Sequence, residues 1–85
     1  MALVRGQVVR SRAGRDKDTF LVVLACTGTQ VLVCDGKQRP LERPKSKNLR
    51  HITMTSHTLC EEEMATNRAI RRALREKNLL AAGGN

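Results

Sequence analysis

The fold follows from one stretch, Thr19-Phe20-Leu21-Val22-Val23-Leu24-Ala25-Cys26-Thr27-Gly28-Thr29-Gln30-Val31-Leu32-Val33-Cys34. Residues 19–26 are rich in β-branched side chains and apolar on both faces, which is typical of a strand covered on both sides. Residues 27–30 have the composition of a tight turn, and residues 31–34 that of another strand. The stretch therefore predicts two strands joined by a short turn.

Further short strands are expected on either side of this pair. Residues 4–11 should form a strand before it, and residues 48–53 a strand after it. Pro40 and Pro44 exclude the stretch between from a central strand, because proline has no backbone N–H to donate. Four or five short strands joined by turns predict a mainly β fold, a small antiparallel barrel of the SH3-like kind.

The composition changes after residue 55, which divides the chain into a barrel (1–55) and a C-terminal helical extension (56–85). Thr58 and Glu61 have the spacing of a capping box, so one helix is expected from there to about Leu80. Two interpretations of this helix are open. It covers an open end of the barrel, or it adds a second basic arm made of Arg71, Arg72 and Arg75.

The net charge is +8, with 16 Lys and Arg against 8 Asp and Glu. The excess is local. Residues 1–55 hold eleven basic and four acidic residues, whereas residues 56–85 hold five and four. A localised basic excess is typical of a surface that binds a polyanion such as nucleic acid.

Two segments carry most of this charge. The first lies around Gly14, where a missing side chain lets the backbone approach a phosphate, and Asp16 and Asp18 could orient its arginines. The second follows residue 36 and is stiffened by its two prolines. The residues expected to contact RNA are Arg12, Gly14, Arg15, Lys17, Lys37, Arg39, Arg43, Lys45, Lys47 and Arg50.

Several function classes are disfavoured by what the chain lacks. Phe20 is the only aromatic residue, so an aromatic cage or a row of rings for stacking bases cannot be built. No nucleophile, paired-carboxylate or phosphate-loop motif occurs, and we expect no enzyme activity, no cofactor and no small-molecule substrate. His57 and Cys60 have no second pair to complete a metal site. The three cysteines are expected to be small buried side chains in a reducing cytoplasm, and no apolar run is long enough to cross a membrane.

Two parts of the sequence resemble a known family. Residues 4–17, with Gly14, resemble the opening of a KOW motif. The string Lys37-x-Arg39-Pro40-Leu41-x-x-Pro44-Lys45-x-Lys47-Asn48-x-x-His51 looks like small bacterial KOW-domain RNA-binding proteins, which are similar to the L14e/L6e/L27e group of ribosomal proteins. The Asn67-x-x-Ile70-Arg71-x-Ala73-Leu74 segment looks like their C-terminal extension.

This resemblance implies an SH3-like barrel that binds ribosomal or other structured RNA, with the Gly14 loop as a contact element. It leaves open whether the protein is a ribosomal subunit or a ribosome-associated factor. Two alternatives also remain. The first is a protein–protein adaptor in transcription or translation that uses the C-terminal helix, and the second is nonspecific binding of DNA.

Overall fold

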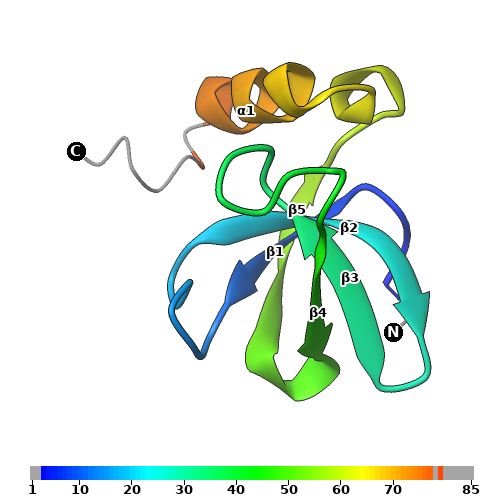
Figure 1. The fold of residues 1–85 in the computed structure, drawn as a ribbon, viewed down its shortest axis with the longest axis vertical. Coiled ribbons are helices and arrows are strands. Elements are labelled where there is room, and N and C mark those ends of the chain that lie inside the picture. The colour runs from blue at the N-terminus through cyan, green and yellow to red at the C-terminus, as the bar shows by residue number, and fades with distance from the viewer. Residues whose placement is uncertain (1–2, 78, 80–85) are drawn as a thin grey trace.

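Five antiparallel strands form one curled sheet, and a helix lies across one end of it (Figure 1). The computed structural model describes residues 3–77 and 79. The strands are β1 (Gln7–Ser11), β2 (Phe20–Thr27), β3 (Gln30–Cys34), β4 (Lys45–Asn48) and β5 (Ile52–Thr58). Two 3₁₀ turns, η1 (Leu49–His51) and η2 (Glu62–Met64), and the helix α1 (Asn67–Glu76) complete the order. The predicted mainly β, SH3-like fold with one C-terminal helix is confirmed.

The sheet order is β4-β3-β2-β1-β5, so the predicted strand pair β2–β3 lies inside the sheet. The alternation of side chains along these strands fills two apolar clusters. One, inside the barrel, contains Val9, Leu21, Val23, Val31 and Val33. The other, between the barrel and the helix segment, contains Val8, Val22, Cys34, Leu59, Met64, Ile70, Ala73, Leu74 and Leu79. The apolar character of β2 on both faces is thereby explained.

The helix α1 covers one end of the barrel, as the first of the two interpretations expected. Ile70 and Leu74 are fully buried in the cluster that it shares with the sheet. Its N-cap is Thr66, whose hydroxyl accepts a hydrogen bond from the amide of Ala69 at 3.0 Å. No helix among the described residues is long and apolar enough to cross a membrane.

The predicted strand at residues 48–53 is wrong. Residues 49–51 form η1 instead, because the side chain of Asn48 accepts a hydrogen bond from the amide of Arg50 at 3.0 Å and turns the chain. The segment is therefore split between β4, which begins directly after Pro44 at the sheet edge, and β5. The position of β4 agrees with the exclusion of the proline-containing stretch from the sheet centre.

The predicted helix start at Thr58 is also wrong. Thr58 belongs to β5 and pairs with Gln7, and the next amide, that of Leu59, donates to the carbonyl of Gly6 at 2.8 Å. These bonds hold the backbone extended three residues past the predicted end of the barrel segment. The helix ends at Glu76 with Lys77 as its C-cap, and the predicted end at Leu80 lies outside the described residues.

Only one of the three cysteines fits the expectation of small buried side chains. Cys34 is buried between sheet and helix, and this burial raises the pKa of its thiol to about 11. Cys26 and Cys60 are exposed. Cys60 follows the last strand in an irregular segment and therefore lies outside α1.

The side chain of Gln7 donates hydrogen bonds to backbone carbonyls at a bulge in β5, which the sequence did not predict. The register between β1 and β5 shifts after Gln7, and its buried side chain fills the gap. Its amide Nε2 donates to the carbonyls of Thr55, His57 and Val8 at 2.7, 3.2 and 3.3 Å. We expect Gln7→Met, which keeps the side-chain length but has no donor, to lower the free energy of unfolding by about 1–3 kcal/mol.

Urea denaturation measures this loss, with Gln30→Met as the matched control on the exposed side of β3. The control should change stability by no more than about 0.5 kcal/mol. Equal losses in the two variants would show that the bulge does not depend on the Gln7 amide.

Candidate nucleic-acid interface

Residues 12–18, which make up most of the segment between β1 and β2, form a closed loop that is hydrogen-bonded to its neighbours. The amide of Asp18 donates to the carbonyl of Ser11 at 2.8 Å, and the amide of Lys17 donates to that of Gly14 at 3.2 Å. The amide of Arg12 donates to the carbonyl of His51 in η1, also at 2.8 Å. This loop is therefore attached to both β1 and η1.

The loop exposes the residues that the sequence singled out. Arg12, Arg15 and Lys17 are exposed, and so is Gly14 at the turn, with a φ of +86°. The structure thus presents three cations around a residue without a side chain, as predicted.

A buried ion pair joins this loop to β4. Lys47 Nζ lies 2.9 Å from Asp16 Oδ1 and 3.2 Å from the carbonyl oxygen of Ala13. The two charged side chains are each only 7% exposed, and the hydroxyl of Ser11 donates to the same carboxylate oxygen. Burial alone would raise the pKa of Asp16, but the hydrogen bonds from Lys47 and Ser11 outweigh it and hold that pKa below its usual value.

Lys47 consequently differs from the other predicted contact residues. Its charge is neutralised inside the protein, and its side chain is not available to a phosphate. We therefore remove Lys47 from the set of expected contacts. Asp16 does not orient arginines, as its place in the first basic segment suggested, but fixes the loop to β4. Asp18 does pair with an arginine, since its Oδ1 lies 2.8 Å from Nη2 of Arg10.

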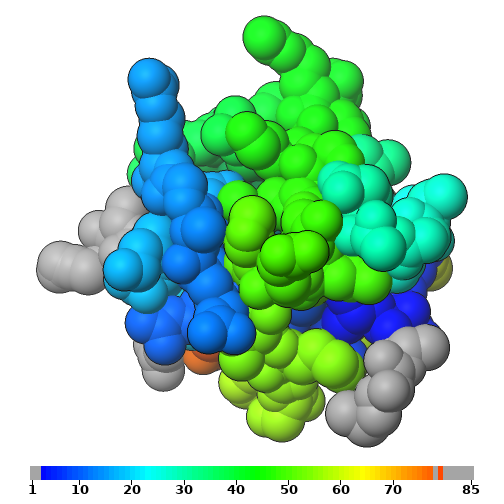
Figure 2. Space-filling model, turned by 90° about the horizontal axis from the view of Figure 1, so that it is seen from below, coloured from blue at the N-terminus to red at the C-terminus, as the bar shows by residue number. Residues whose placement is uncertain are grey.

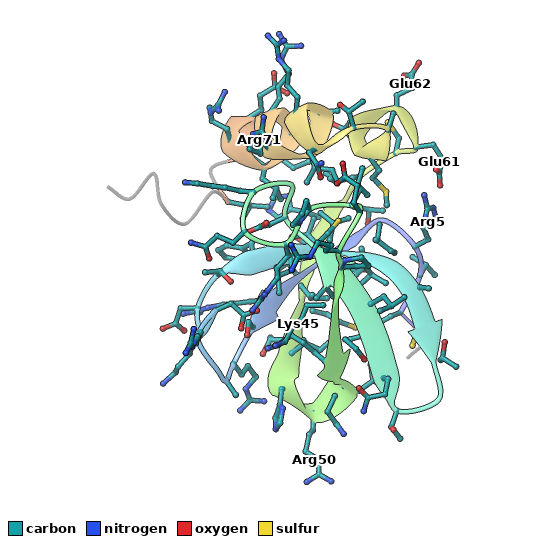
Figure 3. The ribbon with its side chains drawn as sticks, viewed as in Figure 1. Arg5, Lys45, Arg50, Glu61, Glu62 and Arg71 are labelled. Carbon is teal, nitrogen blue, oxygen red and sulfur yellow. The ribbon has the colours of Figure 1, made fainter. Side chains whose placement is uncertain are left out.

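The pair brings the two basic segments to the same face of the molecule. Figure 2 shows the blue segment of residues 12–18 beside the green segments of β4 and η1. Lys45 and Arg50 are exposed, the first on β4 and the second at the tip of η1 (Figure 3). We call this surface the basic face, and it comprises Arg12, Gly14, Arg15, Lys17, Lys45 and Arg50.

The other three predicted contacts lie nearer to the helix, in the loop of residues 35–44. Lys37 and Arg43 are exposed, and Arg39 is half-buried. The loop is held from within by Asp35, whose Oδ1 accepts hydrogen bonds from the amides of Lys37 and Arg39, both at 2.9 Å.

The helix α1 holds the same loop from outside. Asn67 Oδ1 accepts from the amide of Leu41 at 2.7 Å, and its Nδ2 donates to the carboxylate of Glu42 at 2.9 Å. Arg71 donates to the carbonyl of Gly36. Arg71, Lys45 and Arg50 follow one another along the long axis of the molecule (Figure 3), and the loop joins β3 to β4 on the side of the helix.

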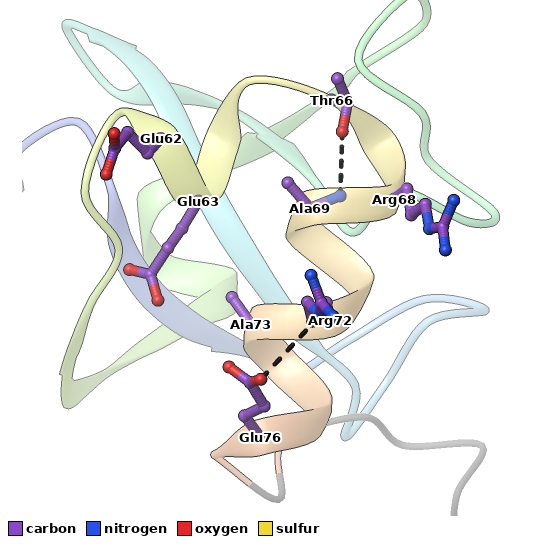
Figure 4. A pocket seen from close by; sticks show the side chains of 8 residues that line it. All are labelled: Glu62, Glu63, Thr66, Arg68, Ala69, Arg72, Ala73 and Glu76. Carbon is purple, nitrogen blue, oxygen red and sulfur yellow. Dashed lines mark hydrogen bonds and ion pairs between the residues drawn. The ribbon is translucent and has the colours of Figure 1, made fainter.

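The outer side of the helix has a different charge pattern. A groove there is lined by Glu62, Glu63, Thr66, Arg68, Ala69, Arg72, Ala73 and Glu76 (Figure 4). Its three carboxylates exceed its two arginines, and Arg72 Nε lies 4.0 Å from Glu76 Oε2. Of the three arginines of the predicted second basic arm, only Arg72 lines this groove, where it lies beside Glu76, and Arg75 is exposed.

Two features could not be found by the sequence reasoning. These are the Asp16–Lys47 pair and the attachment of the 35–44 loop by Asn67. Each joins residues distant in sequence or on different elements, and no local pattern signals it. Within residues 3–77 and 79, no three His, Cys, Asp or Glu side chains gather as a possible metal site.

Comparison with known proteins adds no identification. No protein-family model matches the chain, and no curated protein matches it. The resemblance to KOW-domain proteins stays a prediction.

Proposed function

We propose that this protein binds structured RNA through its basic face, by contacts to the phosphate backbone. The observation that carries the proposal is the buried Asp16–Lys47 pair, which fixes two cation-rich segments on one surface and leaves their other cations exposed. Cations held in position lose less entropy on binding than cations on free side chains, and arginine matches the geometry of a phosphate.

The aromatic content supports structured RNA over splayed single strands. Single-strand binders stack bases on exposed rings. Phe20 is the only aromatic residue of the chain, and it packs half-buried against the cluster under the helix. Recognition by charge and backbone shape, which suits A-form RNA, is what remains.

The resemblance to KOW-domain proteins supports a more specific version of the proposal. In that version the RNA is ribosomal, and the protein is a ribosomal or ribosome-associated component that acts in the cytoplasm. It is a binding protein and not an enzyme, and it needs no cofactor.

The test is charge reversal on the basic face. We expect Arg15→Glu combined with Lys45→Glu to abolish the retention of a folded ribosomal RNA fragment, measured by fluorescence anisotropy. The wild-type affinity should fall on the order of a hundredfold between 50 and 200 mM salt if about five phosphates are neutralised.

The matched control is Arg68→Glu combined with Arg75→Glu, two exposed positions on α1. It changes the net charge of the protein by the same amount but leaves the basic face intact. We expect it to bind RNA nearly as well as the wild type. Equal losses in the two double variants, or a flat salt response, would contradict the proposal.

A protein–protein adaptor is the second candidate, and the groove of α1, with three carboxylates against two arginines, favours it over a polyanion ligand. An excess of carboxylates repels a polyanion, whereas side chains of both signs can pair with opposite charges on a protein partner. The same variants separate the two candidates. An adaptor complex would survive reversal at Arg15 and Lys45 and would be weakened by reversal at Arg68 and Arg75.

A further inference from the structure

A polar hollow lies between the 12–18 loop and β5. It is lined by Arg10, Ser11, Arg12, Lys17, Asp18 and Thr53. Its walls are fixed, because Arg10 pairs with Thr53 across the β1–β5 ladder and Arg12 is bonded to His51 through the backbone. Arg12 and Lys17 belong to the basic face, so the hollow is part of that surface.

Asp18 is the unexpected residue of this hollow. A carboxylate on a surface that binds phosphates repels the ligand, so it weakens binding unless it makes a favourable contact there. Asp18 Oδ1 lies 2.8 Å from Arg10 Nη2, and this is the only hydrogen bond that the carboxylate accepts in the described part of the chain. The side chain stays 61% exposed, which leaves the carboxylate accessible to a ligand.

The backbone of Asp18 is also unusual. Its φ is +71°, and among the described residues it is the only one other than glycine with a positive φ. Such a conformation costs free energy in any residue with a side chain, although Asp and Asn tolerate it better than most. Glycine would relieve this strain, so the carboxylate itself needs an explanation.

We propose that Asp18 accepts a hydrogen bond from a ribose 2′-hydroxyl while Arg12 and Lys17 bind the adjacent phosphate. The 2′-hydroxyl is the donor that distinguishes RNA from DNA, and an ionised carboxylate can only accept. Arg10 binds Oδ1 of this carboxylate, and Oδ2 accepts no hydrogen bond from the described residues. This inference rests on the proposed function and makes the basic face selective for ribose.

The test uses an RNA hairpin and the same hairpin with fluorine at every 2′ position. The fluorinated probe keeps the charge and an A-form shape but has no 2′ donor. The proteins compared are the wild type, Asp18→Gly and Asp18→Asn, because both substitutes tolerate a positive φ. The ratio of the two dissociation constants measures the ribose preference of each protein.

We expect the wild type to prefer the hydroxylated hairpin, and Asp18→Gly to reduce this preference about fivefold, as for the loss of one hydrogen bond. Asp18→Asn should bind both probes more tightly, because the charge repulsion is gone, and should retain most of the preference, because its amide oxygen still accepts. A purely structural role of Asp18 in orienting Arg10 would change both affinities equally and would overturn the inference. If the wild type binds neither hairpin, the proposed function fails as well.

Discussion

Lys47→Met is expected to lower the free energy of unfolding by about 3–5 kcal/mol, the cost of leaving one partner of a buried ion pair alone. The methionine keeps most of the apolar length of the lysine but removes its charge. Asp16 then keeps a buried carboxylate with only Ser11 as a side-chain donor. Urea denaturation followed by circular dichroism measures the loss.

Lys45→Met is the matched control, because it lies two residues earlier in β4 and is exposed. We expect it to change stability by no more than about 0.5 kcal/mol but to weaken RNA binding. The two lysines should therefore separate stability from binding. If Lys47→Met and Lys45→Met lost equal amounts of stability and of RNA affinity, the distinction between a buried and an exposed lysine would be contradicted.

The double variant Asp16→Leu with Lys47→Met completes the argument. Replacing both members of a buried pair by apolar side chains is often neutral, so most of the lost stability should return. Ser11 retains an acceptor for its hydroxyl hydrogen, since the carbonyl oxygen of Ala13 also lies within hydrogen-bond distance, at 3.0 Å. Because neither charge belongs to the basic face, the double variant should still bind RNA.

The pH dependence of Lys47→Met gives a further check on the cause. In the wild type the folded-state pKa of Asp16 lies below the ordinary pKa of an aspartate. Ionised Asp16 therefore adds to the free energy of unfolding at pH values above that ordinary pKa. This stabilisation is lost as the pH falls through the folded-state pKa. In the variant the lysine donor is gone and burial favours the neutral acid. The difference in stability between the two proteins should therefore shrink as the pH is lowered from 7 to about 4. A difference independent of pH would assign the loss to packing.

The prediction of the strands succeeded where local patterns decide the outcome. Continuous apolar residues and a short turn fix β2 and β3, and prolines place β4 at the edge. It failed where a distant partner decides. Thr58 and Glu61 have the spacing of a capping box, but pairing with Gln7 keeps Thr58 in a strand.

The same reason explains why the burial of Lys47 was not predicted. Lys47 lies in the basic stretch Lys45-Ser46-Lys47, and no neighbouring residue in the sequence distinguishes it from Lys45. The register does not separate the two lysines either, because their cross-strand partners, Val31 for Lys47 and Val33 for Lys45, both belong to the barrel interior. Only the arrival of the 12–18 loop supplies the carboxylate that makes a buried lysine stable.

Gly36→Ala is expected to lower the free energy of unfolding by about 2–4 kcal/mol, combining backbone strain with overpacking. The φ of Gly36 is +76°, and an added β-carbon would lie 2.5 Å from the carbonyl oxygen of Asn67 and 3.2 Å from the β-carbon of Ile70. Neither neighbour can yield alone, because both belong to the first turns of α1. The helix would have to move away from the barrel and expose Ile70 and Leu74.

Gly28→Ala isolates the steric part of this effect. Gly28 also has a positive φ, of +58°, but a β-carbon there would meet no atom within 4 Å. It should therefore lose only about 1 kcal/mol, the cost of the strain. Hydrogen exchange is measured for each variant at the same number of degrees below its own unfolding temperature. Under these conditions the amides of Ile70 and Leu74 should exchange faster in Gly36→Ala than in Gly28→Ala. Equal stability and equal exchange in the two variants would mean that the 35–44 loop, with its three cations, is not held in place by close contact with the helix.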